Sequence, residues 1–194
     1  MEVSINMKFD DIAWGTFFIG DIFTVKRPSA RNKDAYEEGS VPFVASGSVN
    51  NGVLKCCAPY ENEVLDQARC ITVSPVDGSA FYQPYHFLGR GGAGSSILLL
   101  YNEQINLFNG QFIAKMIHHT CSSKYNYGHM GNKDSIKRER IMLPITEEGA
   151  PDYQFMEDYI RELMIAKRKQ YREYAEKQSK LLALAETNRG TTLI

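Results

Sequence analysis

Residues 152–188, DYQFMEDYIRELMIAKRKQYREYAEKQSKLLALAETN, contain neither glycine nor proline. Glu, Lys, Arg, Gln, Ala and Leu dominate the segment, and these residues favour helix. Apolar side chains such as Phe155 and Leu163 recur every three or four positions, which predicts one amphipathic helix. Asp152 is a plausible N-cap. At 1.5 Å per residue the helix would be about 55 Å long, which is longer than a compact domain of ~150 residues can cover.

We therefore expect the distal half of this helix to pack against another helix, supplied by another chain. The alternative is a helix that folds back on its own domain. The residues expected to form the dimer or partner face are Ile160, Leu163, Tyr171, Tyr174, Leu181 and Leu182.

Before residue 151 the chain has a different character, with short β-branched and aromatic runs separated by Gly, Pro and Asn. These runs predict strands at 41–46, 53–57, 68–74, 80–85, 96–100 and 112–117, with a turn at Asn50-Asn51-Gly52. Short helices are expected at 19–23, 103–108 and 111–117, so 111–117 is left open between helix and strand. The expected fold class is α+β. An irregular, mixed, β-rich globule (1–150) precedes one long C-terminal helix (151–189) and a tail (190–194).

Composition excludes several classes of protein. The chain has 194 residues, a net charge of −1 and 43% hydrophobic residues, which is typical of a soluble globular protein and argues against a general nucleic-acid coat. Cys56 and Cys57 are adjacent and do not form the CxxC pair of zinc sites, so the cysteines are expected to be buried in a reduced cytoplasm. No secretory signal, membrane span, metal or cofactor is predicted.

A basic segment lies just before the helix. Six cations occur between residues 115 and 140, interleaved with tyrosines and opposed only by Asp134 and Glu139. Cations bind phosphates, and flat or forked side chains contact bases, so the pattern favours nucleic acid as a partner. By itself it leaves DNA, RNA and other anionic partners open, and a local patch of this kind can dock on one face of double-stranded DNA. The residues predicted to contact DNA here are Lys124, Tyr125, Tyr127, Asn132, Lys133, Lys137 and Arg138.

Two loops add candidates for DNA contact. Asn50 and Asn51 carry amides that can read adenine. In the glycine-rich loop 89–96, Arg90 can bind a phosphate or a guanine, and Ser95 and Ser96 can bind phosphate oxygens. A nucleotide-binding reading of this loop is weak, because it has no lysine and is followed by a strand-like run instead of a helix.

Catalytic patterns are poorly represented. There is no HExxH motif and no Ser/His/Asp order, and the single Pro-Asp pair, Pro151-Asp152, opens the helix instead of ending a strand. His118 and His119 are expected at a half-exposed strand end, where adjacent side chains point apart. Two alternatives stay open: a small nuclease or nucleotide-binding enzyme that uses loop 89–96, and a coiled-coil adaptor that does not bind DNA.

The order of several short motifs resembles a known family. Trp14 is followed by segments at 19–23, 39–44, 50–53 and 71–95, and the chain leaves the globule through 136–144 into the long helix. This order is similar to a target-recognition domain of the specificity subunit of type I restriction-modification systems. The resemblance covers residues 14–184.

The resemblance implies a non-catalytic, DNA-reading globule from the cytoplasm of a bacterium or archaeon. In that family two globules are joined by two antiparallel helices that separate two half-sites. Modification (methyltransferase) subunits dock on the helices, and restriction (translocase and endonuclease) subunits cleave. This chain has one globule and one helix, and residues 143–149 depart from the family pattern. A homodimer that reads a palindromic bipartite site is expected; an excised domain or one half of a two-gene unit are alternatives.

Overall fold

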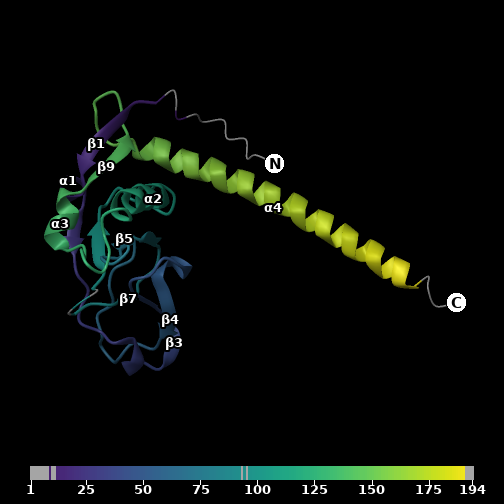
Figure 1. Cartoon of the computed structure of the whole chain (residues 1–194), viewed down its shortest axis with the longest axis horizontal. Coiled ribbons are helices and arrows are strands. Elements are labelled where there is room, and N and C mark those ends of the chain that lie inside the picture. Colours follow the sequence, from purple (N-terminus) through teal and green to yellow (C-terminus); the bar gives the residue numbers. More distant parts are fainter. Residues whose placement is uncertain (1–8, 10–11, 93, 95, 191–194) are drawn as a thin grey trace.

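The computed structural model describes residue 9, residues 12–92, residue 94 and residues 96–190. Figure 1 shows a β-rich globule from which one long helix, α4 (Tyr153–Gly190), projects far beyond the rest of the chain. The expected fold class, an α+β globule followed by a long C-terminal helix, is confirmed. In the described part of the chain, no helix has both the length and the apolar character needed to cross a membrane.

The strands of the globule are short. They are β1 (Trp14–Phe18), β2 (Thr24–Lys26), β3 (Glu38–Val44), β4 (Val53–Cys57), β5 (Cys70–Val73), β6 (Ala80–Gln83), β7 (Leu88–Gly89), β8 (Leu98–Tyr101) and β9 (Arg140–Pro144). The remaining helical elements are α1 (Ile19–Ile22), the 3₁₀ turns η2 (Lys33–Ala35) and η3 (Asn50–Gly52), α2 (Asn109–Cys121) and α3 (Lys133–Arg138).

Three sheets organise the globule. A central four-stranded sheet has the order β2-β8-β5-β6, a second sheet has the order β4-β3-β7, and β1 pairs with β9. Successive residues of a strand face opposite sides, and β8 uses both. Leu98 and Leu100 pack in the main core with α2 and α4, whereas Leu99 packs with Val44 of β3 in a smaller core.

Most predicted strands are found near their expected positions, and α1 matches the helical turn expected at 19–23. The strand reading of 112–117 is wrong, because Phe112, Ile113 and Ile117 are buried on one face of helix α2. The short helix expected at 103–108 is also wrong; these residues form turns that lead into α2. His118 and His119 therefore lie on a helix and not at a strand end.

The first turns of α4 are fastened to the globule. The Asp152 carboxylate accepts a hydrogen bond from the Phe155 amide at 2.8 Å, as expected of an N-cap. Met156 and Ile160 are buried in the main core, and Leu163 packs against it. Ile160 was expected on the dimer face, and this assignment is corrected because its side chain is only 9% exposed within its own chain.

The distal half of α4 has no such cover. The remaining apolar side chains of the expected partner face, Tyr171, Tyr174, Leu181 and Leu182, are all at least half exposed. Figure 1 shows the same separation, with the distal turns far from the labelled strands. The helix is long enough, at about 57 Å for its 38 residues, for both halves to have different contacts.

A buried cation joins the loop between β2 and η2 to the loop between β4 and β5. Arg31 pairs with Glu63 at 2.8 Å and with Asp66 at 2.7 Å, and its side chain is 4% exposed. The same guanidinium donates to the Val64 carbonyl at 2.7 Å. Burial works against the Glu63 carboxylate, but hydrogen bonds from Arg31 and Tyr36 keep its pKa below the ordinary value.

Arg31→Ala should lower the free energy of unfolding by about 3–5 kcal/mol, because it leaves two partly buried carboxylates without their cation. Urea titration at pH 7 measures this loss, and Lys33→Ala, at an exposed ion pair, is the control that should leave the free energy of unfolding nearly unchanged. The lowered pKa of Glu63 gives stability that is present above its unfolded pKa of about 4.3 and is lost as pH falls through the folded value. The difference in the free energy of unfolding between Arg31→Ala and the unchanged chain should therefore shrink as the pH falls below about 4.3. An equal difference at pH 7 and pH 3 would contradict this explanation.

Candidate nucleic-acid interface

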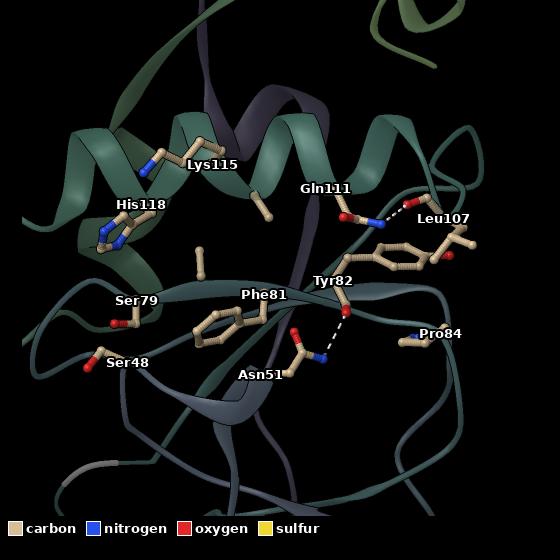
Figure 2. A pocket seen from close by; sticks show the side chains of 12 residues that line it. Ser48, Asn51, Ser79, Phe81, Tyr82, Pro84, Leu107, Gln111, Lys115 and His118 are labelled. Carbon is tan, nitrogen blue, oxygen red and sulfur yellow. Dashed lines mark hydrogen bonds between the residues drawn. The ribbon is translucent and has the colours of Figure 1, made fainter. Parts of the chain in front are cut away.

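A groove of about 570 Å³ lies between α2 and the edge strand β6. Figure 2 shows Gln111, Lys115 and His118 on α2 across from Ser79 and Phe81, with Asn51 and Ser48 along the lower wall. We call this the α2 groove. Gln111, Lys115 and His118 are spaced by four and three residues, so they form one polar stripe on the helix. The groove thus combines a cation, amides, hydroxyls and an aromatic ring.

Close packing of α2 on the sheet forms this groove. A side chain at Gly110 would bring its Cβ within 2.3 Å of the Tyr82 ring, so only glycine permits the approach. At the other end of the helix, Gly78 has φ +68° and would bring a Cβ within 2.4 Å of the Cys121 backbone. The His118 ring nitrogen Nδ1 donates to the Gly78 carbonyl at 3.2 Å. Because a carbonyl only accepts, Nδ1 carries the hydrogen of this bond, and in the neutral ring Nε2 is then an acceptor.

The lower wall is held by a reciprocal pair of amides. Asn51 Nδ2 donates to Gln83 Oε1 at 3.1 Å, and Gln83 Nε2 donates to the Asn51 carbonyl at 3.0 Å. Gln83 is 4% exposed and also donates to the Thr72 hydroxyl. Asn50 and Asn51 adopt positive φ values of 49° and 56°, a conformation in which Asn is enriched. The Asn51 amide nitrogen is therefore engaged in holding η3 on the sheet.

A neighbouring hollow of about 350 Å³ continues along the same face. It shares with the α2 groove the loop from β3 to η3 and the turn between β5 and β6, and its lining includes Ser46, Asp77, Asn126 and Tyr127. Exposed apolar side chains lie on these loops: Val49, between β3 and η3, is 74% exposed, and Tyr127, between α2 and α3, is 86% exposed. Exposed rings and polar groups around a hollow are typical of a binding face.

The structure separates the two tyrosines of the basic segment. Tyr127 is exposed as the DNA hypothesis requires, but Tyr125 is 3% exposed and packs in the main core. Gly131 lies against the Tyr125 ring so closely that a Cβ there would be 2.4 Å from it. Burial raises the pKa of the Tyr125 hydroxyl. The predicted contact between Tyr125 and DNA is therefore wrong, because the ring is part of the core.

The basic segment does not form one continuous edge. Lys115 lies in the α2 groove, Lys124 pairs with Glu139, and the Arg140 guanidinium lies 4.7 Å from the centre of the Phe18 ring. The other cations, Lys133, Lys137 and Arg138, are exposed on α3. Asn132 caps α3, its side-chain oxygen accepting from two backbone amides at 2.9 Å. The side chain of Asn132 thus has a structural task besides any contact with DNA.

Helix α3 packs with α1, whereas η3 lies between β3 and β4 in the chain and contacts β6. Lys137 of α3 packs on Gly20 of α1, where an added Cβ would come within 2.9 Å of the lysine. Figure 1 shows α3 and α1 together at one edge of the globule, next to the β1–β9 pair, with β3 and β4 at the opposite end. The α3 cations and the asparagines of η3 therefore belong to different parts of the surface.

The glycine-rich loop is packed against the chain. Gly91 lies so near Pro28 and Ser29 that an added Cβ would be 2.1 Å from the Ser29 carbonyl oxygen. Arg90 is half-buried, and its amide donates to the Val44 carbonyl at 2.8 Å. Ser96 is 4% exposed, which corrects its assignment to phosphate binding, and Ser95 lies outside the described residues. Strand β8 follows the loop, so the helix that a phosphate loop requires is not there.

Sequence reasoning missed the stripe of Gln111, Lys115 and His118. The three polar residues have helical spacing in the sequence. The apolar residues Phe112, Ile113 and Ile117 resemble a β run, however, so the same segment also favours a strand. Once 109–121 is a helix, the apolar residues turn inward and the polar stripe turns toward β6. In the described part of the chain, no three His, Cys, Asp or Glu side chains come together in a way that could hold a metal ion.

Comparison with known proteins gives a consistent family. The family described as "Type I restriction modification DNA specificity domain" matches residues 12–172. A relative in Heyndrickxia coagulans, named "Type II restriction enzyme BgcI specificity subunit S.BcgI", is 26% identical over 160 residues, which are 81% of this chain and 46% of the relative.

Solved structures of low sequence identity share the fold. One, from a study of "complex assembly and conformational transition of the type I R-M system", has a TM-score of 0.59 and 16% identity, covering 88% of this chain and 43% of that one. The type I restriction-modification S subunit from M. genitalium has a TM-score of 0.52 and 16% identity, covering 92% of this chain and 45% of that one. The chain thus spans about half the length of the relatives it matches.

Gln83→Leu should release η3 from the sheet, because leucine keeps the volume but removes both amide bonds to Asn51. The free energy of unfolding should fall by about 1–3 kcal/mol. Hydrogen exchange of the amides at 50–53 should become faster than in the unchanged chain, while Gln104→Leu, at an exposed position, should leave it unaltered. If exchange in η3 were the same in both variants, the amide pair would not be what holds this wall.

Proposed function

The chain belongs to the family of type I restriction modification DNA specificity domains, and we propose that it is a non-catalytic unit that recognises a sequence in double-stranded DNA. The match over residues 12–172 carries this proposal, because it includes the globule and the fastened half of α4. In the complete assembly, modification subunits supply methyl transfer and restriction subunits supply cleavage. The unit directs both reactions to its site.

The α2 groove and its neighbouring hollow are the proposed reading surface. Lys115 can donate to guanine. The Gln111 side-chain nitrogen donates to the Leu107 carbonyl at 2.9 Å, and its oxygen and second hydrogen can pair with adenine. His118 Nε2 can accept from an exocyclic amine, and Val49 and Tyr127 can contact thymine methyl groups. The groove is built by backbone contacts at Gly78 and Gly110, so these side chains are held on a rigid frame.

The cations of α3 have a different proposed task. Lys133, Lys137 and Arg138 are exposed on a capped helix away from η3, where they can bind phosphates without reading bases. A nucleotide-binding enzyme that uses loop 89–96 is less favoured, because the loop is packed against Pro28 and Ser29 and precedes a strand.

Changes in the two surfaces should have different effects. Replacing Lys133, Lys137 and Arg138 with Ala should weaken binding to all duplexes and reduce the salt slope by about 0.9 for each phosphate that the chain no longer neutralises. Replacing Lys115 and His118 with Ala should instead reduce discrimination between the preferred duplex and scrambled DNA by about 5- to 150-fold. Fluorescence anisotropy at several salt concentrations measures both, with Lys180→Ala on the distal helix as control. If neither set changed affinity or discrimination, the proposed DNA interface would be wrong.

The exposed half of α4 is proposed to pair with a second copy. A stripe of Met164, Lys167, Tyr171, Tyr174, Gln178 and Leu181 recurs at alternating intervals of three and four residues, and all of these side chains are exposed. Ile160 lies four residues before Met164 and fits the same heptad-like spacing, but its side chain is buried against the globule. A second helix is the occupant that matches such a stripe.

One antiparallel register suits this stripe best. A two-fold axis between Arg172 and Glu173 places Met164 opposite Leu181 and Tyr171 opposite Tyr174. The polar residues Lys167 and Gln178 then face each other, and a polar pair inside such a seam fixes register. A shift by one heptad would place Lys167 or Gln178 against an apolar partner. Two globules would then lie at opposite ends of the pair, as reading of an inverted repeat requires.

This register predicts a specific disulfide. Two variants are made in a Cys56→Ser background, one with Met164→Cys and one with Leu181→Cys. When they are mixed, they should form a disulfide-linked dimer. Either variant alone should not, because like positions would lie about 26 Å apart along the seam. Non-reducing electrophoresis after mild oxidation measures the product, and sedimentation of the unchanged chain measures its mass. A chain that stays monomeric, or that links like positions, would contradict the antiparallel pair.

A further inference from the structure

The segment between β8 and α2, residues 102–108, is held by hydrogen bonds although it has no regular structure, and Asn109 begins α2. Its asparagines bond to one another: the Asn106 amide donates to Asn109 Oδ1 at 2.7 Å, and the Asn109 amide donates to Asn106 Oδ1 at 3.1 Å. Asn109 is 1% exposed, and Ile105 is fully buried in the main core. The segment is therefore a fixed part of the globule.

Three side chains of this segment hold the first turns of α4. Asn102 Nδ2 donates to the Tyr153 hydroxyl at 3.0 Å and to the Ile22 carbonyl at 2.9 Å. The side-chain nitrogen Nδ2 of Asn106 donates to Glu157 Oε2. We call these contacts, together with the one described next, the helix clamp.

The third contact joins an arginine to an aromatic ring. The Arg161 guanidinium lies 3.8 Å from the centre of the Phe108 ring, and it also donates to Glu157 Oε1 at 2.9 and 2.6 Å. Hydrogen bonds from Arg161 and then Asn106 hold the pKa of Glu157 below its ordinary value. Glu157 is thus the centre of the clamp, because it bonds to the loop and to Arg161 at once.

The helix clamp lies beside the apolar contact that Met156 and Ile160 of α4 make with the main core. Tyr153, Glu157 and Arg161 are spaced by four residues and form one stripe along α4, while Met156 and Ile160 form an adjacent stripe that is buried in the core. One line of contact would let a helix rock about it. Two neighbouring lines fix both its rotation and its tilt.

We propose that the helix clamp is the positioning device that sets the angle at which α4 leaves the globule. Resting on the proposed function, this angle sets the number of base pairs between the two half-sites that a paired chain reads. Asn102, Asn106, Phe108, Tyr153, Glu157 and Arg161 are its positioning residues, and none of them needs to touch DNA.

The lever arm makes the angle matter. From Arg161 to Leu182 the helix extends about 32 Å, so a tilt of about 10° moves its distal end by roughly 5–6 Å. One base pair occupies about 3.4 Å of the duplex axis. A change of angle that costs little in packing therefore corresponds to more than one base pair of spacing. The apolar contact alone, at the base of the lever, controls this angle poorly.

The first test measures the angle without DNA. Cys56 is exposed, unlike the other three cysteines, so the expectation of burial is wrong for this residue. Spin labels on Cys56 and on Ser179→Cys give the distance between the globule and the distal helix, and excess unlabelled chain removes distances between copies. Glu157→Gln and Arg161→Ala should widen this distance distribution by about 5 Å. Glu173→Gln, an exposed carboxylate outside the clamp, is the matched control and should keep the narrow distribution. Thermal melting confirms that each variant is folded, and Asn106→Ala is the second variant if one of them is not.

The second test measures spacing on DNA. Duplexes that differ only in the number of base pairs between half-sites are compared by gel shift. The unchanged chain should prefer one spacing, and Glu157→Gln should accept neighbouring spacings with affinities that differ by less than about threefold. Unchanged distances in Glu157→Gln and Arg161→Ala would overturn the clamp, and broad distances with an unchanged spacing preference would overturn its link to spacing. Failure of the unchanged chain to bind any duplex would instead count against the proposed function and leave the distance result intact.

Discussion

The packing of α2 between the central sheet and α4 is the constraint on which the rest of the structure depends. One face of α2 buries Phe112, Ile113 and Ile117 against the sheet and α4. Its polar stripe forms one wall of a groove, and the segment that precedes it, residues 102–108, holds the base of the long helix. Because α2 supports both the α2 groove and the base of α4, the orientation of the groove and the direction of α4 are fixed relative to each other.

This arrangement supports both proposed tasks of the chain, recognition of a DNA sequence and control of the spacing between half-sites. Reading requires side chains held on a frame, and the glycines at 78 and 110 let α2 approach the sheet closely enough to provide it. Measuring requires a stiff lever, and a helix of 38 residues provides one only when its base is fixed. The helix clamp and the apolar stripe fix that base together.

Local signals in the sequence predicted part of this well. The long helix and its Asp152 cap, strand β4 and the turn of η3 follow from helix propensity, capping and turn chemistry, which depend on neighbouring residues. The sequence of helix α2 is compatible with helix or strand, because β-branched and aromatic residues are common in strands and the burial of α2 depends on distant partners. The burial of Tyr125 could not be predicted either, since it depends on the close approach of Gly131 and on packing in the core. For Ser96, burial depends on how the glycine-rich loop lies against Pro28 and Ser29. The same dependence on tertiary contacts explains why the basic segment, continuous in sequence, is divided among α2, a loop, α3 and β9.

Family membership and the local geometry together support a unit that recognises DNA and leaves the chemistry to its partners. Selection of bound duplexes from a fully randomised pool by the unchanged chain puts sequence recognition itself to the test. We predict that a short sequence motif is enriched, present twice as an inverted repeat with one fixed spacing. A pool that is retained at low salt without enrichment of any motif would show binding through phosphates alone and would contradict sequence recognition by this chain.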